Sequence, residues 1–224
     1  MITSRDNATL TLVRKLLRGR KHREETGLFA AEGEDLAAAA SDAGVEPVHL
    51  LVAGETVEES LLARVSTLPH PARVIGVYRS ADLPTDRRDT CLGLWRLADP
   101  GNVGSLLRAA DAFGASVALS DGCADPVSPK ALRASAGAIF RVPLVPWEET
   151  PGARIALSAH GGLALHDLEL VPPLTFLLGS ERDGLPSELL EASTRATIGL
   201  PGGAESLNVA AAGAIALYEL TRRA

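Results

Sequence analysis

Three glycine-containing segments in the C-terminal half of the chain each follow an apolar, strand-like run and lead into a helical pattern. They are centred on Asn102, Glu181 and Asn208. Units of strand, turn and helix build parallel sheets with helices on both faces, and ligands bind such sheets at the carboxyl ends of the strands. The sequence therefore predicts an α/β fold in which the three segments meet at one edge of a parallel sheet.

The other elements of this half follow from apolar runs and helical spacing. The expected strands cover residues 91–97, 116–120, 142–145, 163–166, 174–178 and 196–200. The expected helices cover residues 104–113, 129–136 and 206–222. Ser206 is expected to cap the last helix, with Arg222 and Arg223 favourably placed at its negative end.

The first half shows a shorter α/β alternation. Its expected helices cover residues 7–17, 34–43 and 57–65, and its expected strands cover 28–31, 48–53 and 73–77. Gly19 is a plausible stop for the first helix. The polar stretch 80–89 contains Pro84 and is the best candidate for a linker. We therefore expect a small domain over residues 1–80, a linker over 81–89 and a second domain over 90–224.

Several function classes are disfavoured. Gly179 and Gly184 have the spacing of a phosphate loop, but Leu185 and Pro186 follow where Lys and Ser or Thr are required, so a nucleoside triphosphatase is not expected. No G-x-G-x-x-G follows the first strand of either half, which disfavours an ordinary dinucleotide site. The histidine and cysteine spacing predicts no metal site, and the two cysteines indicate reduced core residues. The sequence also predicts no membrane span and no secretory signal, as is typical of a cytoplasmic protein.

Taken one at a time, the three segments remain ambiguous. A glycine turn that opens a helix exposes backbone N–H groups and allows close approach of a ligand. The same pattern is also typical of a capped helix or a tight strand-to-helix turn with no ligand. Only their joint order separates these alternatives.

That joint order resembles the three motifs of the SpoU (TrmH-like) branch of the SPOUT RNA methyltransferases. DPGNVGSLLRAADAFGA resembles the first motif, GSERDGLP the second and LPGGAESLNVAAAGAIALYE the third, and the resemblance covers roughly residues 91–220. It implies a parallel α/β catalytic domain with a C-terminal trefoil knot, S-adenosylmethionine as cofactor, a homodimer and 2′-O-methylation of a ribose in RNA. Ser4, Asn7 and the segment 29–33 are similar to a small ribosomal-protein-like RNA-binding domain that precedes this domain in many members.

The resemblance also implies roles for individual residues. The polar active-site positions are matched by Asn102, Arg108, Glu181, Ser206 and Asn208. The cofactor-contacting positions and their neighbours are matched by Leu178, Gly179, Ser180, Leu200, Pro201 and Leu207.

A basic cluster in the first half is the predicted RNA contact. The chain carries a net charge of −6, but phosphates respond to the local field, and no acid interrupts this cluster. Its members are Arg14, Lys15, Arg18, Arg20, Lys21 and Arg23. The alternative is a solvated helix face without a partner.

Methyl transfer to a ribose requires alignment of oxygen, carbon and sulfur and removal of the hydroxyl proton. A charged guanidinium has no acceptor, so Arg108 is expected to grip the adjacent phosphate and stabilise the developing alkoxide rather than to act as the base. Glu181 is expected to orient Arg108 or the ribose, or merely to cap the following turn. The N-terminal half favours 23S ribosomal RNA as substrate. A transfer RNA substrate, a resistance enzyme acting on one ribosomal nucleotide, and a non-catalytic RNA-binding or assembly protein stay open.

Overall fold

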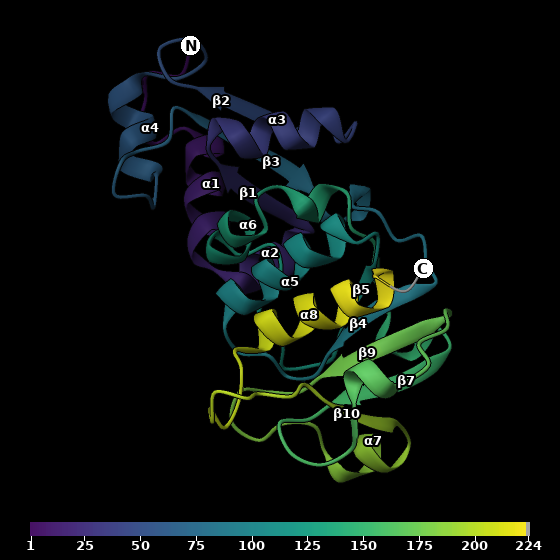
Figure 1. Ribbon diagram of the computed structural model, residues 1–224. Coiled ribbons are helices and arrows are strands. Elements are labelled where there is room, and N and C mark those ends of the chain that lie inside the picture. Colours follow the sequence, from purple (N-terminus) through teal and green to yellow (C-terminus); the bar gives the residue numbers. More distant parts are fainter. Residues whose placement is uncertain (223–224) are drawn as a thin grey trace.

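Two β-sheets organise the chain, which we describe from a computed structural model covering residues 1–222 (Figure 1). The first sheet is antiparallel and has three strands in the order β1-β3-β2. Its strands are β1 (Leu28–Glu32), β2 (His49–Val52) and β3 (Val74–Arg79). Its helices are α1 (Ala8–Arg18), α2 (Arg20–Thr26), α3 (Glu34–Asp42) and α4 (Glu59–Val65). The expected α/β alternation of this half is confirmed, with α2 as an additional short helix.

The helix α1 illustrates how the local sequence fixes these elements. Asn7 caps it, because its side-chain oxygen accepts hydrogen bonds from the backbone N–H groups of Thr9 and Leu10. Gly19 ends it as expected. The apolar residues at helical spacing are all buried, namely Leu10, Val13, Leu16 and Leu17.

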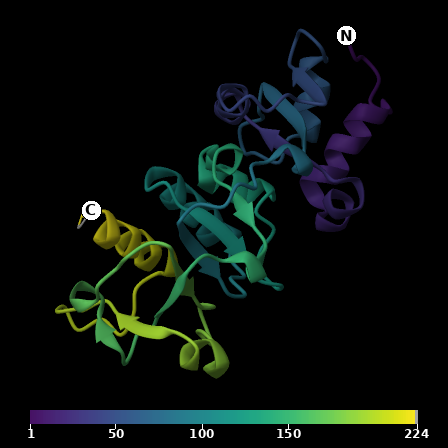
Figure 2. The ribbon, with the colours of Figure 1, turned by 90° about the vertical axis from the view of Figure 1, so that its right-hand side faces the viewer.

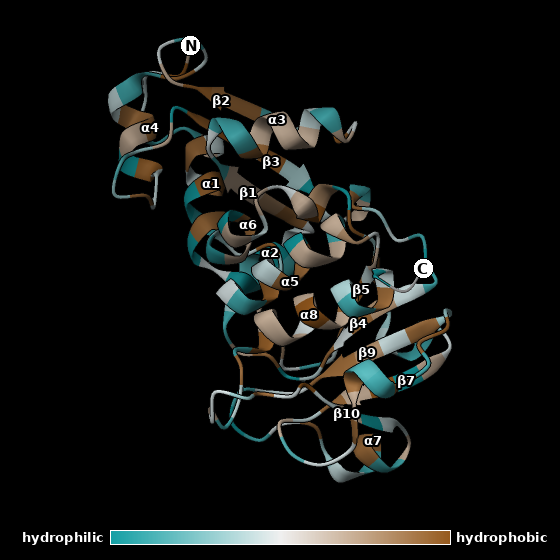
Figure 3. Cartoon of the chain, viewed as in Figure 1, coloured by the Kyte–Doolittle hydropathy of each residue, from teal (hydrophilic) through white to brown (hydrophobic). Residues whose placement is uncertain are grey.

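The second sheet has seven strands in the order β6-β5-β4-β9-β7-β10-β8, and every neighbouring pair is parallel. The strands are β4 (Thr90–Leu94), β5 (Ser116–Leu119), β6 (Leu144–Val145), β7 (Ala153–Leu157), β8 (Leu163–Ala164), β9 (Leu174–Leu178) and β10 (Thr194–Thr197). The helices are α5 (Pro100–Ala112), α6 (Pro129–Ser135), α7 (Ser187–Glu191) and α8 (Val209–Thr221). The predicted parallel sheet is confirmed. Figure 3 shows β9, which is buried throughout, as hydrophobic over most of its length.

Some elements differ from the expectation. The strand β7 was not predicted, because Arg154 interrupts its apolar run; the guanidinium reaches Thr150, where Nη2 donates to Oγ1 at 3.4 Å. The last strand ends at Thr197 rather than 200, and the strand predicted over 163–166 passes after two residues into a 3-10 helix, Leu165–Asp167. Arg222 closes α8 and pairs with Glu219, with 2.7 Å between Nη2 and Oε1. Arg223 lies outside the described residues.

The two sheets are joined by one continuous hydrophobic core. Phe29 of β1 and Tyr78 of β3 pack on Phe140 of the second half, with ring centroids 6.1 and 5.2 Å apart. Within residues 81–89, Leu83 is buried and the carbonyl of Pro84 accepts a hydrogen bond from the N–H of Leu144, whereas most of the other residues are exposed. Figure 2 shows the two halves following one another along the molecule. The segment predicted as a linker contacts this shared core at Leu83, and the first half also has a core cluster of its own around Leu10, Leu62 and Ile75.

Both cysteines, Cys91 and Cys123, are free and buried, as expected for core residues. Burial raises the pKa of the Cys91 thiol to about 11. Among residues 1–222, every helix is too short or too polar to cross a lipid bilayer.

Candidate functional site

The three glycine-containing segments meet at the carboxyl edge of the parallel sheet. Asn208 Nδ2 donates to Asn102 Oδ1 at 3.0 Å, and Asn102 Nδ2 donates to Glu181 Oε1 at 2.9 Å. These side chains come from α8, α5 and the turn after β9, and they are exposed or half-buried. The predicted convergence is confirmed as a chain of hydrogen bonds that ends on a carboxylate.

Asn208 has two roles at the start of α8. Its Oδ1 accepts from the backbone N–H groups of Ala210 and Ala211 at 2.9 and 3.3 Å, so Asn208 is the N-cap. Its amide nitrogen is then free to point at Asn102. The expectation that Ser206 caps this helix was wrong: Asn caps as well as Ser, and α8 begins only at Val209. Ser206 lies exposed in the preceding loop and lines the pocket described below.

Asn102 is fixed by the first turn of α5. Asp99 caps this helix by accepting from the N–H groups of Gly101 and Asn102, and Pro100 occupies its first position. The Lys130 ammonium, 2.8 Å from the Asp99 carboxylate, holds the pKa of that carboxyl below its usual range. The helix starts four residues earlier than predicted, which places Asn102 in its first turn, beside the neighbouring strand ends.

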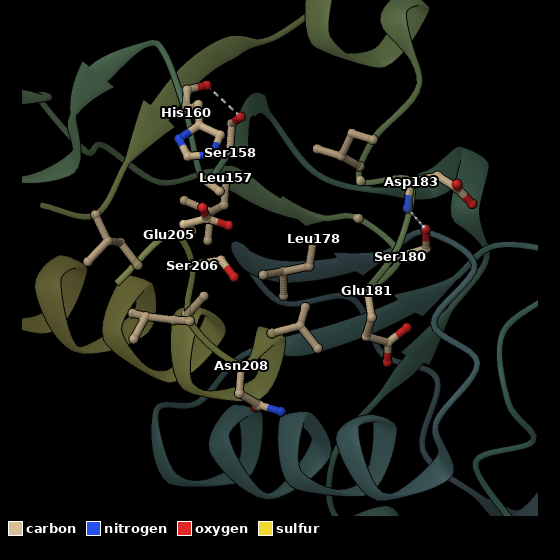
Figure 4. Close-up of a pocket in the computed structure, with 18 of the residues that line it drawn as sticks. Leu157, Ser158, His160, Leu178, Ser180, Glu181, Asp183, Glu205, Ser206 and Asn208 are labelled. Carbon is tan, nitrogen blue, oxygen red and sulfur yellow. Dashed lines mark hydrogen bonds between the residues drawn. The ribbon is translucent and has the colours of Figure 1, made fainter. Parts of the chain in front are cut away.

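A pocket of about 730 Å³ opens beside the hydrogen-bonded side chains of Asn208, Asn102 and Glu181, which we call the polar chain. This volume is typical of small-molecule sites. Five of the six predicted cofactor residues line it, namely Leu178, Gly179, Ser180, Leu200 and Leu207. Pro201, the sixth, is exposed and adjoins Leu200 without lining the pocket. Figure 4 shows Glu181 and Asn208 at one end of the pocket and Ser158 and His160 at the other.

The turn after β9 forms one wall of this pocket. A Cβ on Gly179 would collide with the backbone of Gly184 and Leu185, so only glycine fits there. Ser180 and Gly184 exchange two backbone hydrogen bonds across the turn, and Ser180 Oγ accepts from the N–H of Asp183 at 3.1 Å. Because Ser180 caps the turn, the Glu181 carboxylate is left for Asn102.

One wall of the pocket was not predicted from the sequence. Leu157, Ser158, Ala159 and His160 line it from the end of β7, and Ile198 and Ala212 line it from beside β10 and within α8. The signal was present, since the run ARIALSAHGG also places glycines after an apolar stretch. It went unused because the strand itself was not recognised.

Arg108 is not part of the polar chain. It follows Asn102 by six residues in α5, about 9 Å along the helix axis, and its side chain is exposed. Within residues 1–222 its guanidinium makes no hydrogen bond or ion pair, and it lines neither this pocket nor the adjacent one. The expectation that Glu181 orients Arg108 is therefore not met in this structure.

The basic cluster divides into three groups. Arg23 is buried against the second half, with 2.7 Å between its Nε and Asp125 Oδ2, which corrects its placement among exposed RNA contacts. Arg20 and Lys21 are exposed but pair with Glu24 and Glu25, one turn further along α2. Across the part of the chain that the structure describes, no ion pair involves the remaining members, which are Arg14, Lys15 and Arg18 on α1.

A glycine-walled pocket with converging amides at the carboxyl edge of a parallel sheet is the usual form of a small-molecule site in an α/β protein. The family model described as "SpoU rRNA Methylase family" matches residues 89–218. The chain belongs to this family.

Individual relatives extend over both halves. An uncharacterised tRNA/rRNA methyltransferase from Synechocystis sp. is 34% identical over 80% of this chain and 69% of its own. The 23S rRNA (guanosine(2553)-2′-O)-methyltransferase RlmP from Bacillus subtilis is 29% identical over 92% of this chain and 93% of its own. The AdoMet-bound crystal structure of an rRNA methyltransferase from Sinorhizobium meliloti superposes with a TM-score of 0.87 at 29% identity, covering 99% of this chain and 97% of that one.

Proposed function

We propose that this protein transfers the methyl group of S-adenosylmethionine to the 2′-hydroxyl of a ribose in RNA, and that the substrate is 23S ribosomal RNA. The observation that carries the proposal is the chain from Asn208 through Asn102 to Glu181, which ends beside a glycine-walled pocket. Family membership and the activity of RlmP support the same reaction.

The pocket suits the cofactor. Gly179 leaves backbone where any side chain would collide, so a flat adenine can approach the main chain closely. Leu178, Leu200 and Leu207 supply apolar walls, and Ser158 and Ser180 supply hydroxyl groups. Once bound, S-adenosylmethionine supplies an electrophilic methyl group on its sulfonium, and the thioether that leaves needs no activation.

The protein's own residues would align and stabilise the nucleophile. The Asn102 amide, held at both ends, fixes the Glu181 carboxylate, which would accept a hydrogen bond from the ribose hydroxyl. Ser206 lines the same pocket, and its hydroxyl would be a second hydrogen-bond partner for the ribose hydroxyl. Arg108 has no ion pair or side-chain hydrogen bond among residues 1–222 and is long enough to swing toward an incoming phosphate and to stabilise alkoxide charge.

The preference for ribosomal over transfer RNA rests on the N-terminal half. RlmP matches both this half and the catalytic one, and α1 carries the cations Arg14, Lys15 and Arg18, which form no ion pair within residues 1–222. We propose that residues 1–80 are the ribosomal-protein-like RNA-binding domain implied by the resemblance. A ribosomal substrate would place the enzyme in the cytoplasm.

We also propose the trefoil knot and the homodimer. After β10 the chain returns across the sheet, so that α8 packs on α5 and β9, a path that supports the knot. Ile215 and Tyr218 leave an apolar surface exposed on α8, the helix that Asn208 caps, which supports a dimer contact near the site. Light scattering of wild type and of an Ile215→Asp variant tests the dimer.

The proposed function is tested with methyl-labelled cofactor and separated pools of ribosomal and transfer RNA. We expect label in 23S ribosomal RNA, at a ribose whose 3′-phosphodiester bond resists alkaline cleavage because its 2′-hydroxyl is methylated. Label only in transfer RNA would show that transfer RNA, and not ribosomal RNA, is the substrate. Cofactor binding by calorimetry without label in any RNA would favour a non-catalytic RNA-binding protein.

A further inference from the structure

A second pocket, of about 950 Å³, adjoins the cofactor pocket. The turn residues 180–184 line both pockets. Asn102 also lines the second pocket, so the polar chain stands at the boundary between the two. A group held in the second pocket would therefore meet the cofactor at Asn102 and Glu181.

Arg96 lines this second pocket in an unusual backbone conformation. Its φ of 51° lies in the left-handed region, which is costly for a residue with a side chain. The backbone is held there because the Arg96 N–H donates to the buried Ser120 hydroxyl at 2.9 Å. Strain of this kind persists where the surrounding structure imposes it and is concentrated at ligand-binding positions.

The Arg96 side chain is exposed and available. Its guanidinium takes part in no hydrogen bond or ion pair with any residue from 1 to 222. Three acids line the pocket: Asp99 pairs with Lys130 at 2.8 Å, Glu181 accepts from the Asn102 amide at 2.9 Å, and Asp183 is exposed. Arg96 thus presents its full charge to solvent beside the reaction centre.

One loop connects Arg96 to the basic N-terminal helices. A Cβ on Gly122 would lie 3.3 Å from Arg96 Nε, so the arginine passes over this glycine. The next carbonyl, that of Cys123, accepts from Arg20 Nη1 at 3.0 Å, and Asp125 pairs with Arg23. A strand of RNA lying along this loop would extend from the second pocket to α2.

The pocket also has an aromatic wall. Trp95 lines it and packs on Trp147, with ring centroids 5.5 Å apart. A guanidinium beside a flat aromatic ring suits a phosphate with its attached base.

From these observations we propose that the second pocket binds a nucleotide of the RNA substrate, with Arg96 gripping the phosphate next to the target ribose. The inference rests on the proposed function for the identity of the reaction. Arg96 is a substrate-binding residue that the sequence motifs do not contain.

The test is an Arg96→Gly variant, because glycine removes the guanidinium and also relieves the left-handed strain. We expect a melting temperature equal to or above that of wild type, so misfolding does not obscure the result. The KM for ribosomal RNA should rise about tenfold or more, as expected for loss of a charge-assisted contact. The dissociation constant for S-adenosylmethionine should not change. Arg87→Gly is the matched control, since Arg87 is exposed just before the opposite end of β4, and it should behave as wild type.

Binding of a short oligouridylate gives a second measurement that needs no catalysis. The chain's two tryptophans pack together, and Trp95 lines this pocket, so intrinsic fluorescence should change on binding, and Arg96→Gly should shift the midpoint about tenfold. A variant with unchanged KM and an unchanged midpoint overturns the inference. Wild-type protein that methylates no RNA overturns the proposed function instead, while the oligouridylate result still decides the role of Arg96.

Discussion

The two sheets of this molecule distribute their strand ends differently. In the N-terminal sheet the strands are antiparallel, so their carboxyl ends are divided between opposite edges. In the second sheet every pair is parallel, so β4, β7, β9 and β10 all end at one edge, where both pockets lie. Groups from distant parts of the sequence can converge only there. We therefore expect the chemistry at the parallel sheet, and we expect the antiparallel sheet to support the cations of α1.

The largest effect is expected from removing the Arg23–Asp125 ion pair, which connects the two halves of the molecule. Arg23→Ala leaves the Asp125 carboxylate buried without its partner, which should lower the free energy of unfolding by about 3–5 kcal/mol. Denaturant unfolding monitored by tryptophan fluorescence measures it. A double variant, Arg23→Leu with Asp125→Leu, should recover much of the loss, because it leaves no unpaired charge. A loss below about 1 kcal/mol for Arg23→Ala would show that this pair does not hold the halves together.

The next effect is specific to the parallel edge. Gly179→Ala should weaken binding of S-adenosylmethionine more than about a hundredfold, because its Cβ collides with backbone that shapes the pocket wall. Calorimetry measures the affinity. Gly202→Ala is the control, since a Cβ there meets open space and the residue lies outside the pocket lining. Equal affinities for the two variants would contradict the assignment of this wall.

A smaller effect should separate catalysis from cofactor binding at the same edge. In Asn102→Asp a second carboxylate faces Glu181 in place of the amide donor, which should lower kcat roughly tenfold to a hundredfold. The affinity for S-adenosylmethionine should stay within about twofold. Single-turnover methyl transfer measures the first quantity and calorimetry the second. A fall in cofactor affinity that matches the fall in kcat would assign Asn102 to the cofactor pocket instead.

The smallest effect is expected on the antiparallel half. Replacing Arg14, Lys15 and Arg18 together by Ala should weaken RNA binding about tenfold and reduce the salt slope of log affinity by roughly 2 to 3. Cofactor binding should be unaffected. Filter binding across a salt series measures the slope, with Arg195→Ala of β10 as the control. An unchanged slope would remove α1 from the RNA-binding surface.

Elements that depend on interactions between neighbouring residues were predicted from the sequence better than those that depend on contacts between distant segments. Helix α1 and its Gly19 end depend on neighbours within a few residues and were predicted almost to the residue. The strand β7 was missed because only its position between β9 and β10 makes a short run containing Arg154 into a strand. Ser206 and Asn208 are both acceptable caps locally, and the packing of α8 decides between them.

The sequence by itself determined most of the strands and helices, the three turns that meet at the carboxyl edge of the sheet and, through family resemblance, the reaction. These follow from local periodicity and from the spacing of motifs along the chain. Only the tertiary structure decided which side chains touch. It joined Asn102 to Glu181 and Asn208, buried Arg23 against Asp125, left Arg108 without an ion pair among residues 1–222 and placed Arg96 in the same pocket lining as Asn102. The physical reason is that hydrogen bonds and ion pairs between distant segments depend on distances that strand order and helix packing set.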